Sequence, residues 1–328
     1  MKPLPFLDEE ELRHRMNINA RQGRPFLFII NFLKDKNLCI PLADIDPAQV
    51  MYQVGEKTNA ESCSTEEPFQ FEAFPLGYET YLKRFEKIMY HIRRGDTYLI
   101  NLTQPTSIYS SLSTREIFLR SQAPFRLWVK NHFTVFSPEI FVRVKEGRIY
   151  SYPMKGTIDA SEDRSGETLL NHPKERAEHF TIVDLIRNDL SMVAHEVRVK
   201  RFMYLDRIRT HRGELLQASS EIEGKLPDTW KETLGDWFLR LLPAGSISGA
   251  PKKKTVEILL ETEGYNRGFY TGVFGIFDGE SIESAVMIRF IEENPEGLVF
   301  KSGGGLTFRS DPWKEYQELI QKVYVPIT

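Results

Sequence analysis

Cysteine is scarce in this chain, and long apolar runs are absent. Only two of the 328 residues are cysteines, Cys39 and Cys63, which excludes a disulfide framework and fits a reducing compartment. The longest apolar run, residues 26–33, is interrupted by Asn31 and is too short to span a bilayer. The first ten residues hold prolines and acids instead of the apolar segment of a signal peptide. We therefore expect a cytoplasmic protein.

An excess of one charge is also lacking. The chain has 43 Lys and Arg against 46 Asp and Glu, a net charge of −3. Without a basic excess, we expect neither a nucleic-acid partner nor a membrane-surface partner. What the chain does have is 41% hydrophobic residues, and this content is enough to build a sizeable core.

Strand and helix patterns are mixed along the chain without regular alternation. Residues 78–94 place apolar side chains at helical spacing before Gly95, a plausible C-cap. Asp311 and Pro312 are typical of the N-cap and the first residue of a last helix. The pattern predicts an α+β fold with largely antiparallel sheets. Strands are predicted at 26–33, 97–102, 134–136, 140–144, 148–152, 272–277, 284–291 and 298–301, further helices at 173–189 and 252–260, and loops at 55–70 and 158–173.

No linker of biased composition divides the chain. We therefore expect one domain over residues 1–328, with 78–328 as the core that carries the motifs and 1–77 as a shortened N-terminal part.

Two predicted helices carry pairs of glutamates. Glu175 and Glu178 lie three residues apart, as do Glu315 and Glu318, so each pair shares a helix face. If the two faces converge, their hard carboxylate oxygens suit Mg²⁺. Glutamates at this spacing are also common on solvated helix faces, and spacing alone favours that alternative.

Three small-residue segments could contact an anion or carry an activated amine. The glycines of residues 302–305 let backbone N–H groups approach an anion, or form an ordinary turn. The run at 243–252 leads into a helix whose N-terminus could hold a carboxylate, or is simply a cap. Lys155, in the segment 153–157, is a candidate nucleophile if burial lowers its pKa, although a strand-end lysine is usually structural.

Taken in order, these segments resemble the chorismate-binding enzymes, which include anthranilate synthase component I, aminodeoxychorismate synthase component I, isochorismate synthase and salicylate synthase. The resemblance runs from about Tyr78 to Lys322 and implies two packed antiparallel sheets flanked by helices. Its motifs are SPE at 137–139, PMKGT at 153–157, RAEHFTIVDLIRNDL at 176–190, LLPAGSISGAPK at 241–252, VMIR at 286–289, SGGG at 302–305 and DPWKEYQE at 311–318.

The resemblance implies roles for individual residues. Glu139 would be the general acid for the departing 4-hydroxyl, with a pKa raised by burial and by negative neighbours, and Lys155 would attack the ring with a lowered pKa. Mg²⁺ would be held by Glu175, Glu178, Glu315 and Glu318. Chorismate would be bound by Gly156, Thr157, Gln217, Ser246, Tyr270, Arg289, Gly303, Gly304, Gly305 and Lys322.

Three positions bear on the reaction within the family. Lys155 stands where anthranilate synthases typically carry alanine, and so points to the members that make aminodeoxychorismate. Leu99 stands where water-adding members carry a lysine, which argues against isochorismate and salicylate formation. Gln217 stands where the family often has a histidine near the ring. The short region before Tyr78 lacks the tryptophan-binding element of anthranilate synthases, so tryptophan inhibition is not expected.

An ammonia source is not apparent in the chain. Neither Cys39 nor Cys63 lies on the tight glycine-flanked turn that a glutamine amidotransferase needs. The resemblance therefore implies a separate amidotransferase subunit. Two alternatives stay open: an anthranilate synthase component I, with the same first half-reaction, and a chorismate-binding protein without catalytic activity.

Overall fold

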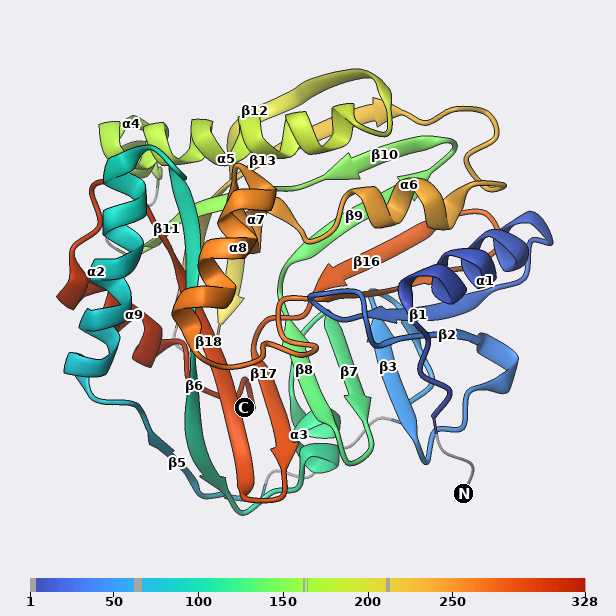
Figure 1. Ribbon diagram of the computed structural model, residues 1–328, viewed down its shortest axis with the longest axis horizontal. Coiled ribbons are helices and arrows are strands. Elements are labelled where there is room, and N and C mark those ends of the chain that lie inside the picture. Colours follow the sequence, from blue (N-terminus) through green and yellow to red (C-terminus); the bar gives the residue numbers. More distant parts are fainter. Residues whose placement is uncertain (1–3, 62–66, 162, 164, 211–212, 328) are drawn as a thin grey trace.

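The strand β1 (Phe26–Ile30) shows how the layers of the fold are built (Figure 1). All five of its apolar residues are buried, because successive side chains of a strand point to opposite faces and both faces are covered. Phe26, Phe28 and Ile30 pack into the core shared with helices on one side. Leu27 and Ile29 pack into a second core that includes strands of the other sheet.

The computed structural model describes residues 4–61, 67–161, 163, 165–210 and 213–327, and it contains two nine-stranded sheets. The first sheet has the order β11-β13-β10-β9-β16-β15-β1-β2, and β12 also pairs with β13. Its pairings are antiparallel. Besides β1, its strands are β2 (Asn37–Pro41), β9 (Ile140–Lys145), β10 (Arg148–Ser151), β11 (Met154–Asp159), β12 (His195–Thr210), β13 (Gly213–Lys225), β15 (Val273–Phe277) and β16 (Ile282–Val286).

The second sheet has the order β14-β6-β18-β17-β8-β7-β3-β4, and β5 also pairs with β6. These pairings are antiparallel as well. Its strands are β3 (Val50–Val54), β4 (Lys57–Thr58), β5 (Phe71–Phe74), β6 (Leu99–Ser110), β7 (Phe125–Val129), β8 (Phe133–Ser137), β14 (Gly249–Ala250), β17 (Phe290–Asn294) and β18 (Gly297–Leu306).

Helices cover the outer faces of both sheets (Figure 1). One core joins α1, α5 and α6 to the first sheet through residues such as Leu12, Ile186 and Phe238. Another joins α2, α8 and α9 to β6. The described helices are α1 (Glu9–Arg21), the 3-10 helix η1 (Leu42–Asp44), α2 (Tyr78–Arg94), α3 (Thr114–Arg120), α4 (Glu167–Asn171), α5 (Pro173–Ser191), α6 (Leu234–Arg240), α7 (Gly245–Ser248), α8 (Lys252–Glu263) and α9 (Pro312–Gln321).

The predicted α+β class with antiparallel sheets is confirmed, as are several boundaries. α2 occupies the predicted residues, and Gly95 ends it in a left-handed conformation with φ of 80°. Asp311 caps α9 by accepting a hydrogen bond from the Lys314 N–H, and Pro312 is the first residue of that helix. No helix in the described ranges is long and apolar enough to cross a membrane.

Four predictions of local structure were wrong. The predicted loop at 55–70 contains the short strand β4. The segment 284–291 is two strands rather than one, since β16 ends at Val286 and Arg289 has a left-handed φ of 55° before β17 begins. The glycines at 303–305 lie inside β18, paired with β6, and form no separate turn. The polar segment 158–173 contains the short helix α4.

Candidate active site

A cavity of about 370 Å³ opens where β6, β11, α5 and α7 meet. This volume is typical of a small-molecule site. Five of the predicted site residues line it: Glu139, Lys155, Glu178, Ser246 and Gly305. Residues without a predicted binding role complete the wall, among them Tyr98, Leu99, Asn101, Met154, Thr181 and Phe308.

Glu139 follows the end of β8, where its N–H donates to Ser137 Oγ at 3.1 Å. Its carboxylate accepts a hydrogen bond from Ser246 Oγ at 2.9 Å. Burial raises the pKa of Glu139, and the Ser246 hydrogen bond with the positive charges of Arg289 and Lys322 opposes the rise. The predicted direction of the pKa is confirmed. The predicted negative neighbours are wrong, since the charged groups that affect this carboxyl are cationic.

Lys155 lies on β11 at a register shift between Met154 and Thr157. Its ammonium is 3.0 Å from Glu178 Oε2. Burial lowers the pKa of Lys155, but the charge and hydrogen bond of Glu178, together with the charges of Glu318 and Glu175, raise it, and the net pKa is raised. The expectation of a lowered pKa was therefore wrong for this arrangement of side chains. The cause is the carboxylate-rich surroundings of the amine.

The four predicted metal ligands come from α5 and α9. Glu178, Glu318 and Glu175 each raise the pKa of Lys155, so both helices direct carboxylates towards this amine. Burial raises the pKa of Glu315, and the nearby charge of Glu318 adds to the rise.

The chemistry of this donor set fits Mg²⁺, because four carboxylates supply the hard oxygen ligands that it prefers. Two of these carboxylates already form ion pairs with lysines. Glu178 pairs with Lys155, and Glu318 Oε1 is 2.7 Å from Lys322 Nζ. As placed, no group of three or more His, Cys, Asp or Glu side chains within the described residues is close enough to hold a metal ion.

Gly156 is required by the path of β11 beside the lysine. Its φ is 88°, a left-handed conformation that side chains disfavour. An added Cβ would lie 2.9 Å from Leu169 Cδ1 and 3.0 Å from Glu175 Oε2. The glycine thus allows α4 and the start of α5 to approach the strand. The side chain of Thr157 lies outside the described residues.

The glycines of β18 have two different neighbourhoods. A Cβ on Gly303 would lie 2.8 Å from the Leu102 backbone oxygen, so this glycine serves strand packing. A Cβ on Gly304 would lie 3.5 Å from Glu315 Oε2, which places this glycine beside a predicted metal ligand. Lys322 Nζ donates to the Gly303 carbonyl at 2.9 Å. Gly305 lines the cavity next to Leu99.

Arg289 and Tyr270 are not among the residues that line the cavity. Arg289 Nε is buried with no hydrogen-bond partner, and the guanidinium lies 5.3 Å from the ring centre of Tyr324. An unpartnered buried donor of this kind fits an anionic ligand. Tyr270 is buried, and burial raises the pKa of its phenol.

Gln217 lies on β13 opposite Thr157 of β11 and is not among the residues that line the cavity. The structure brings a different histidine near the site. His179 of α5, which follows Glu178, is buried, and its Nε2 is 2.7 Å from Ser220 Oγ. Burial lowers the pKa of His179. The sequence placed this residue in a motif but gave no sign of its partner 41 residues away.

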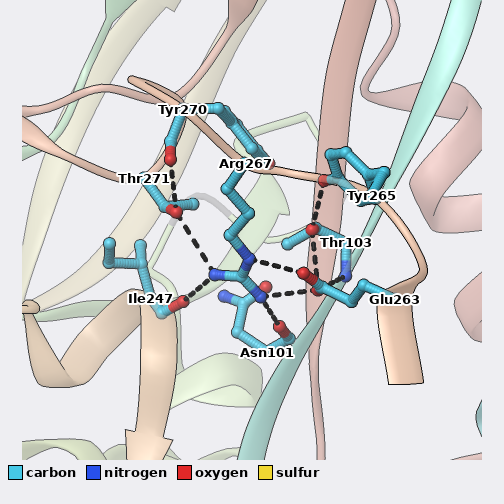
Figure 2. A network of polar contacts seen from close by, with 8 residues as sticks. All are labelled: Asn101, Thr103, Ile247, Glu263, Tyr265, Arg267, Tyr270 and Thr271. Carbon is cyan, nitrogen blue, oxygen red and sulfur yellow. Dashed lines mark hydrogen bonds and ion pairs between the residues drawn. The ribbon is translucent and has the colours of Figure 1, made fainter. Parts of the chain in front are cut away.

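A fully buried ion pair supports the wall of the cavity (Figure 2). The side chains of Arg267 and Glu263 are 1% and 3% exposed, and their nearest charged atoms are 2.6 Å apart. Arg267 also donates to the carbonyls of Asn101 at 2.6 Å and Ile247 at 3.2 Å. Asn101 lines the cavity, and Ile247 follows the cavity residue Ser246. A buried pair with its remaining donors satisfied is strongly destabilising to break.

Cys39 is buried on β2, and its Sγ is 3.7 Å from Asn19 Nδ2. Burial raises the pKa of its thiol to about 12, so the reactive thiolate is not formed near neutral pH. Cys63 lies outside the described residues.

The cavity lies where the two packed antiparallel sheets meet, and Glu139, Glu178 and Lys155 give its wall charged groups that suit a small polar ligand. The chain belongs to the chorismate binding enzyme family, whose model matches residues 27–328. A Haemophilus influenzae relative named "uncharacterized PabA-like protein" is 46% identical over 311 residues, and 95% of each chain is covered.

More distant relatives carry names of two reactions. Aminodeoxychorismate synthase component 1 of Bacillus subtilis is 30% identical, covering 77% of this chain and 56% of the relative. An anthranilate synthase component 1 of Haloarcula marismortui is 34% identical, covering 74% of this chain and 52% of the relative. The structure of a 2,3-dihydroxybenzoate-specific isochorismate synthase from Bacillus anthracis superposes with a TM-score of 0.71 at 23% identity, covering 96% of this chain and 86% of that one. This likeness identifies the fold.

Proposed function

We propose that this chain is the synthase component of an aminodeoxychorismate synthase, which converts chorismate and ammonia to 4-amino-4-deoxychorismate. The observation that carries the proposal is the presence of Lys155 and Glu139 in one cavity of a chorismate binding enzyme. A lysine in that wall is a potential nucleophile, and a buried carboxyl is a potential proton donor.

Glu139 is the general acid of the proposed reaction. The 4-hydroxyl of chorismate leaves poorly as hydroxide, so a proton must be supplied as the C–O bond breaks. Burial raises the pKa of Glu139 and favours its protonated form. Ser246 orients the carboxyl by donating to it.

Lys155 is the nucleophile. Its amine must first lose the proton that Glu178 stabilises in the ammonium. The neutral amine then attacks C2 of the ring while the 4-hydroxyl takes the proton of Glu139 and leaves as water. Ammonia adds at C4 and expels the lysine amine, and the resulting ammonium returns a proton to Glu139. The atoms balance as chorismate plus ammonia giving aminodeoxychorismate plus water.

Glu175, Glu178, Glu315 and Glu318 are the proposed ligands of Mg²⁺. The ion, when bound, supplies positive charge that holds and neutralises a substrate carboxylate. Arg289, with its unpartnered buried Nε, is the proposed partner of a second anionic group. Lys322 contributes positive charge near Glu139.

A glutamine amidotransferase subunit is the proposed source of ammonia. The word "component" in the names of the Bacillus subtilis and Haloarcula marismortui relatives supports a second subunit. The buried, protonated thiol of Cys39 supports it as well, since this cysteine cannot serve as a glutaminase nucleophile.

An anthranilate synthase component is the second candidate, supported by the 34% identity to the Haloarcula marismortui protein. It shares the attack at C2 with loss of the 4-hydroxyl, but ammonia itself adds at C2 and pyruvate is then eliminated. The purified chain should be incubated with chorismate, Mg²⁺ and ammonium, and its products separated. We expect 4-amino-4-deoxychorismate, which is not aromatic. Fluorescent anthranilate as the main product would favour the second candidate instead.

A further inference from the structure

The short helix α7 carries Ser246, and a partly buried ion pair anchors its first residue. Lys252 Nζ lies 3.1 Å from both carboxylate oxygens of Asp189 and also donates to the Leu241 carbonyl at 2.9 Å. The backbone N–H of Gly245 donates to Asp189 as well. The last part of α5 is thereby tied to both ends of the segment that contains Ser246.

Gly245 permits this close approach. A Cβ at this position would lie 2.8 Å from Asp189 Oδ2 and 3.1 Å from Leu185 Cγ. Only a residue without a side chain lets the carboxylate reach the backbone here. The contact between Asp189 and α7 therefore depends on glycine at position 245.

The other side of α7 is anchored by the second ion pair. Arg267 donates to the Ile247 carbonyl, one residue beyond Ser246. The carboxylate of Glu263 holds the guanidinium and also accepts a hydrogen bond from the Thr103 hydroxyl (Figure 2). Ser246 thus lies between two fixed backbone groups, and its Oγ points to Glu139 at 2.9 Å.

We propose that Asp189 and Arg267 are positioning residues for the general acid, acting on Glu139 through Ser246. The inference rests on the proposed function, in which Glu139 donates the proton. The ion pairs of Asp189 and Arg267 do not contact Glu139 directly. Their effect on the reaction passes through the backbone of α7, because displacing Ser246 removes the hydrogen bond that aims the carboxyl.

The loss of this hydrogen bond has a predictable sign. Ser246 donates to the charged carboxylate, so its displacement raises the pKa of Glu139 further. The acid acts only when protonated, and the alkaline limb of the rate profile therefore moves to higher pH. Glu139 is also faced by Arg289, Lys322 and Tyr270, which all variants below retain. The titratable neighbours of Asp189 are Lys252 and Tyr98, and Lys252 is in turn near Lys34. The variants below also retain Lys252, Tyr98 and Lys34.

The test compares Asp189→Asn, Ser246→Ala and the double variant, with Asp184→Asn as the matched control on the same helix. The pH dependence of kcat is measured with chorismate, Mg²⁺ and ammonium, and folding is followed by thermal unfolding. Asp189→Asn and Ser246→Ala should both move the alkaline limb upwards and lower kcat by about 10- to 100-fold. The double variant should equal Ser246→Ala, since both act on one contact. Asp184→Asn should match the wild type.

Arg267→Lys keeps a charge beside Glu263 but cannot reach both carbonyls, and it should show the same upward movement. If Asp189→Asn does not fold, this variant tests the inference through the Arg267 anchor of α7 instead. A lower melting temperature with an unmoved limb for both variants would overturn the inference, as would additive effects in the double variant. If Ser246→Ala and Glu139→Gln also leave the profile unchanged, the general-acid role itself fails, and with it the proposed function.

Discussion

The ammonium of Lys155 lies 3.0 Å from the carboxylate of Glu178, so the candidate nucleophile is paired with a candidate metal ligand. This ion pair links the candidate nucleophile to the candidate metal site. It raises the pKa of Lys155 against the effect of burial, and the same carboxylate must be shared with a cation if one binds. A change to Glu178 is therefore expected to affect both Lys155 and cation binding.

Replacing Lys155 should stop amination. Lys155→Ala removes the amine, and we expect the rate of product formation to fall by about 100-fold or more. Lys155→Arg is the matched control, because arginine keeps the charge beside Glu178 but is no nucleophile. Both variants should be inactive with ammonium as donor. Near-normal turnover by the arginine variant would reduce Lys155 to an electrostatic role.

Turnover should depend on Mg²⁺. Glu318→Gln removes one of four carboxylates, and activity should be lost while the fold is kept, because the side chain lies on the exposed part of α9. Glu257→Gln, on the exposed face of α8, is the control and should behave as the wild type. Activity is measured across a magnesium titration and in excess EDTA. Full activity in EDTA would rule out the metal assignment.

Gly156→Ala should impair both stability and metal use. The left-handed φ of 88° alone costs about 1–2 kcal/mol for alanine, and the new Cβ also meets Leu169 and Glu175. Gly95→Ala is a matched control, because its φ is 80° with nothing within 4 Å of the added carbon. Chemical denaturation should show the larger loss for Gly156→Ala, and only this variant should need more Mg²⁺. Equal behaviour of the two would place Gly156 outside the site.

The isolated chain should use ammonium but not glutamine. The thiol of Cys39 is buried and protonated, so it offers no nucleophile for glutamine hydrolysis. Product formation is followed with each nitrogen donor, and Cys39→Ala is compared with the wild type. We expect identical ammonium-dependent rates. Product formed from glutamine by this chain alone would contradict the need for a partner.

Local signals predicted much of the fold. The helical spacing of residues 78–94 and the Asp311-Pro312 start of α9 depend on nearby residues only, and both were confirmed. The hairpin of β12 and β13 was missed because register shifts at three places in β12 interrupt the alternation of its side chains. The break at Arg289 was missed because a left-handed φ at a non-glycine residue leaves no mark in the sequence.

The motifs predicted which residues line the cavity, but they did not predict which other residues these contact. Glu139, Lys155 and Ser246 were expected at one site, and all three line it. The pairing of Asp189 with Lys252, 63 residues apart, depends on how α5 packs beside α7 and α8. The cationic surroundings of Glu139 and the raised pKa of Lys155 likewise follow from tertiary packing, which spacing along the chain does not record.

Trapping the covalent intermediate tests the central claim most directly. The wild type is mixed with chorismate and Mg²⁺ without ammonia, quenched, digested and analysed by mass spectrometry, with Lys155→Arg treated in parallel. The account predicts an adduct of chorismate less water on the peptide that contains Lys155, lost when ammonium is added before quenching and absent from the variant. An active enzyme that yields no adduct on Lys155, or an adduct that persists in Lys155→Arg, would contradict it.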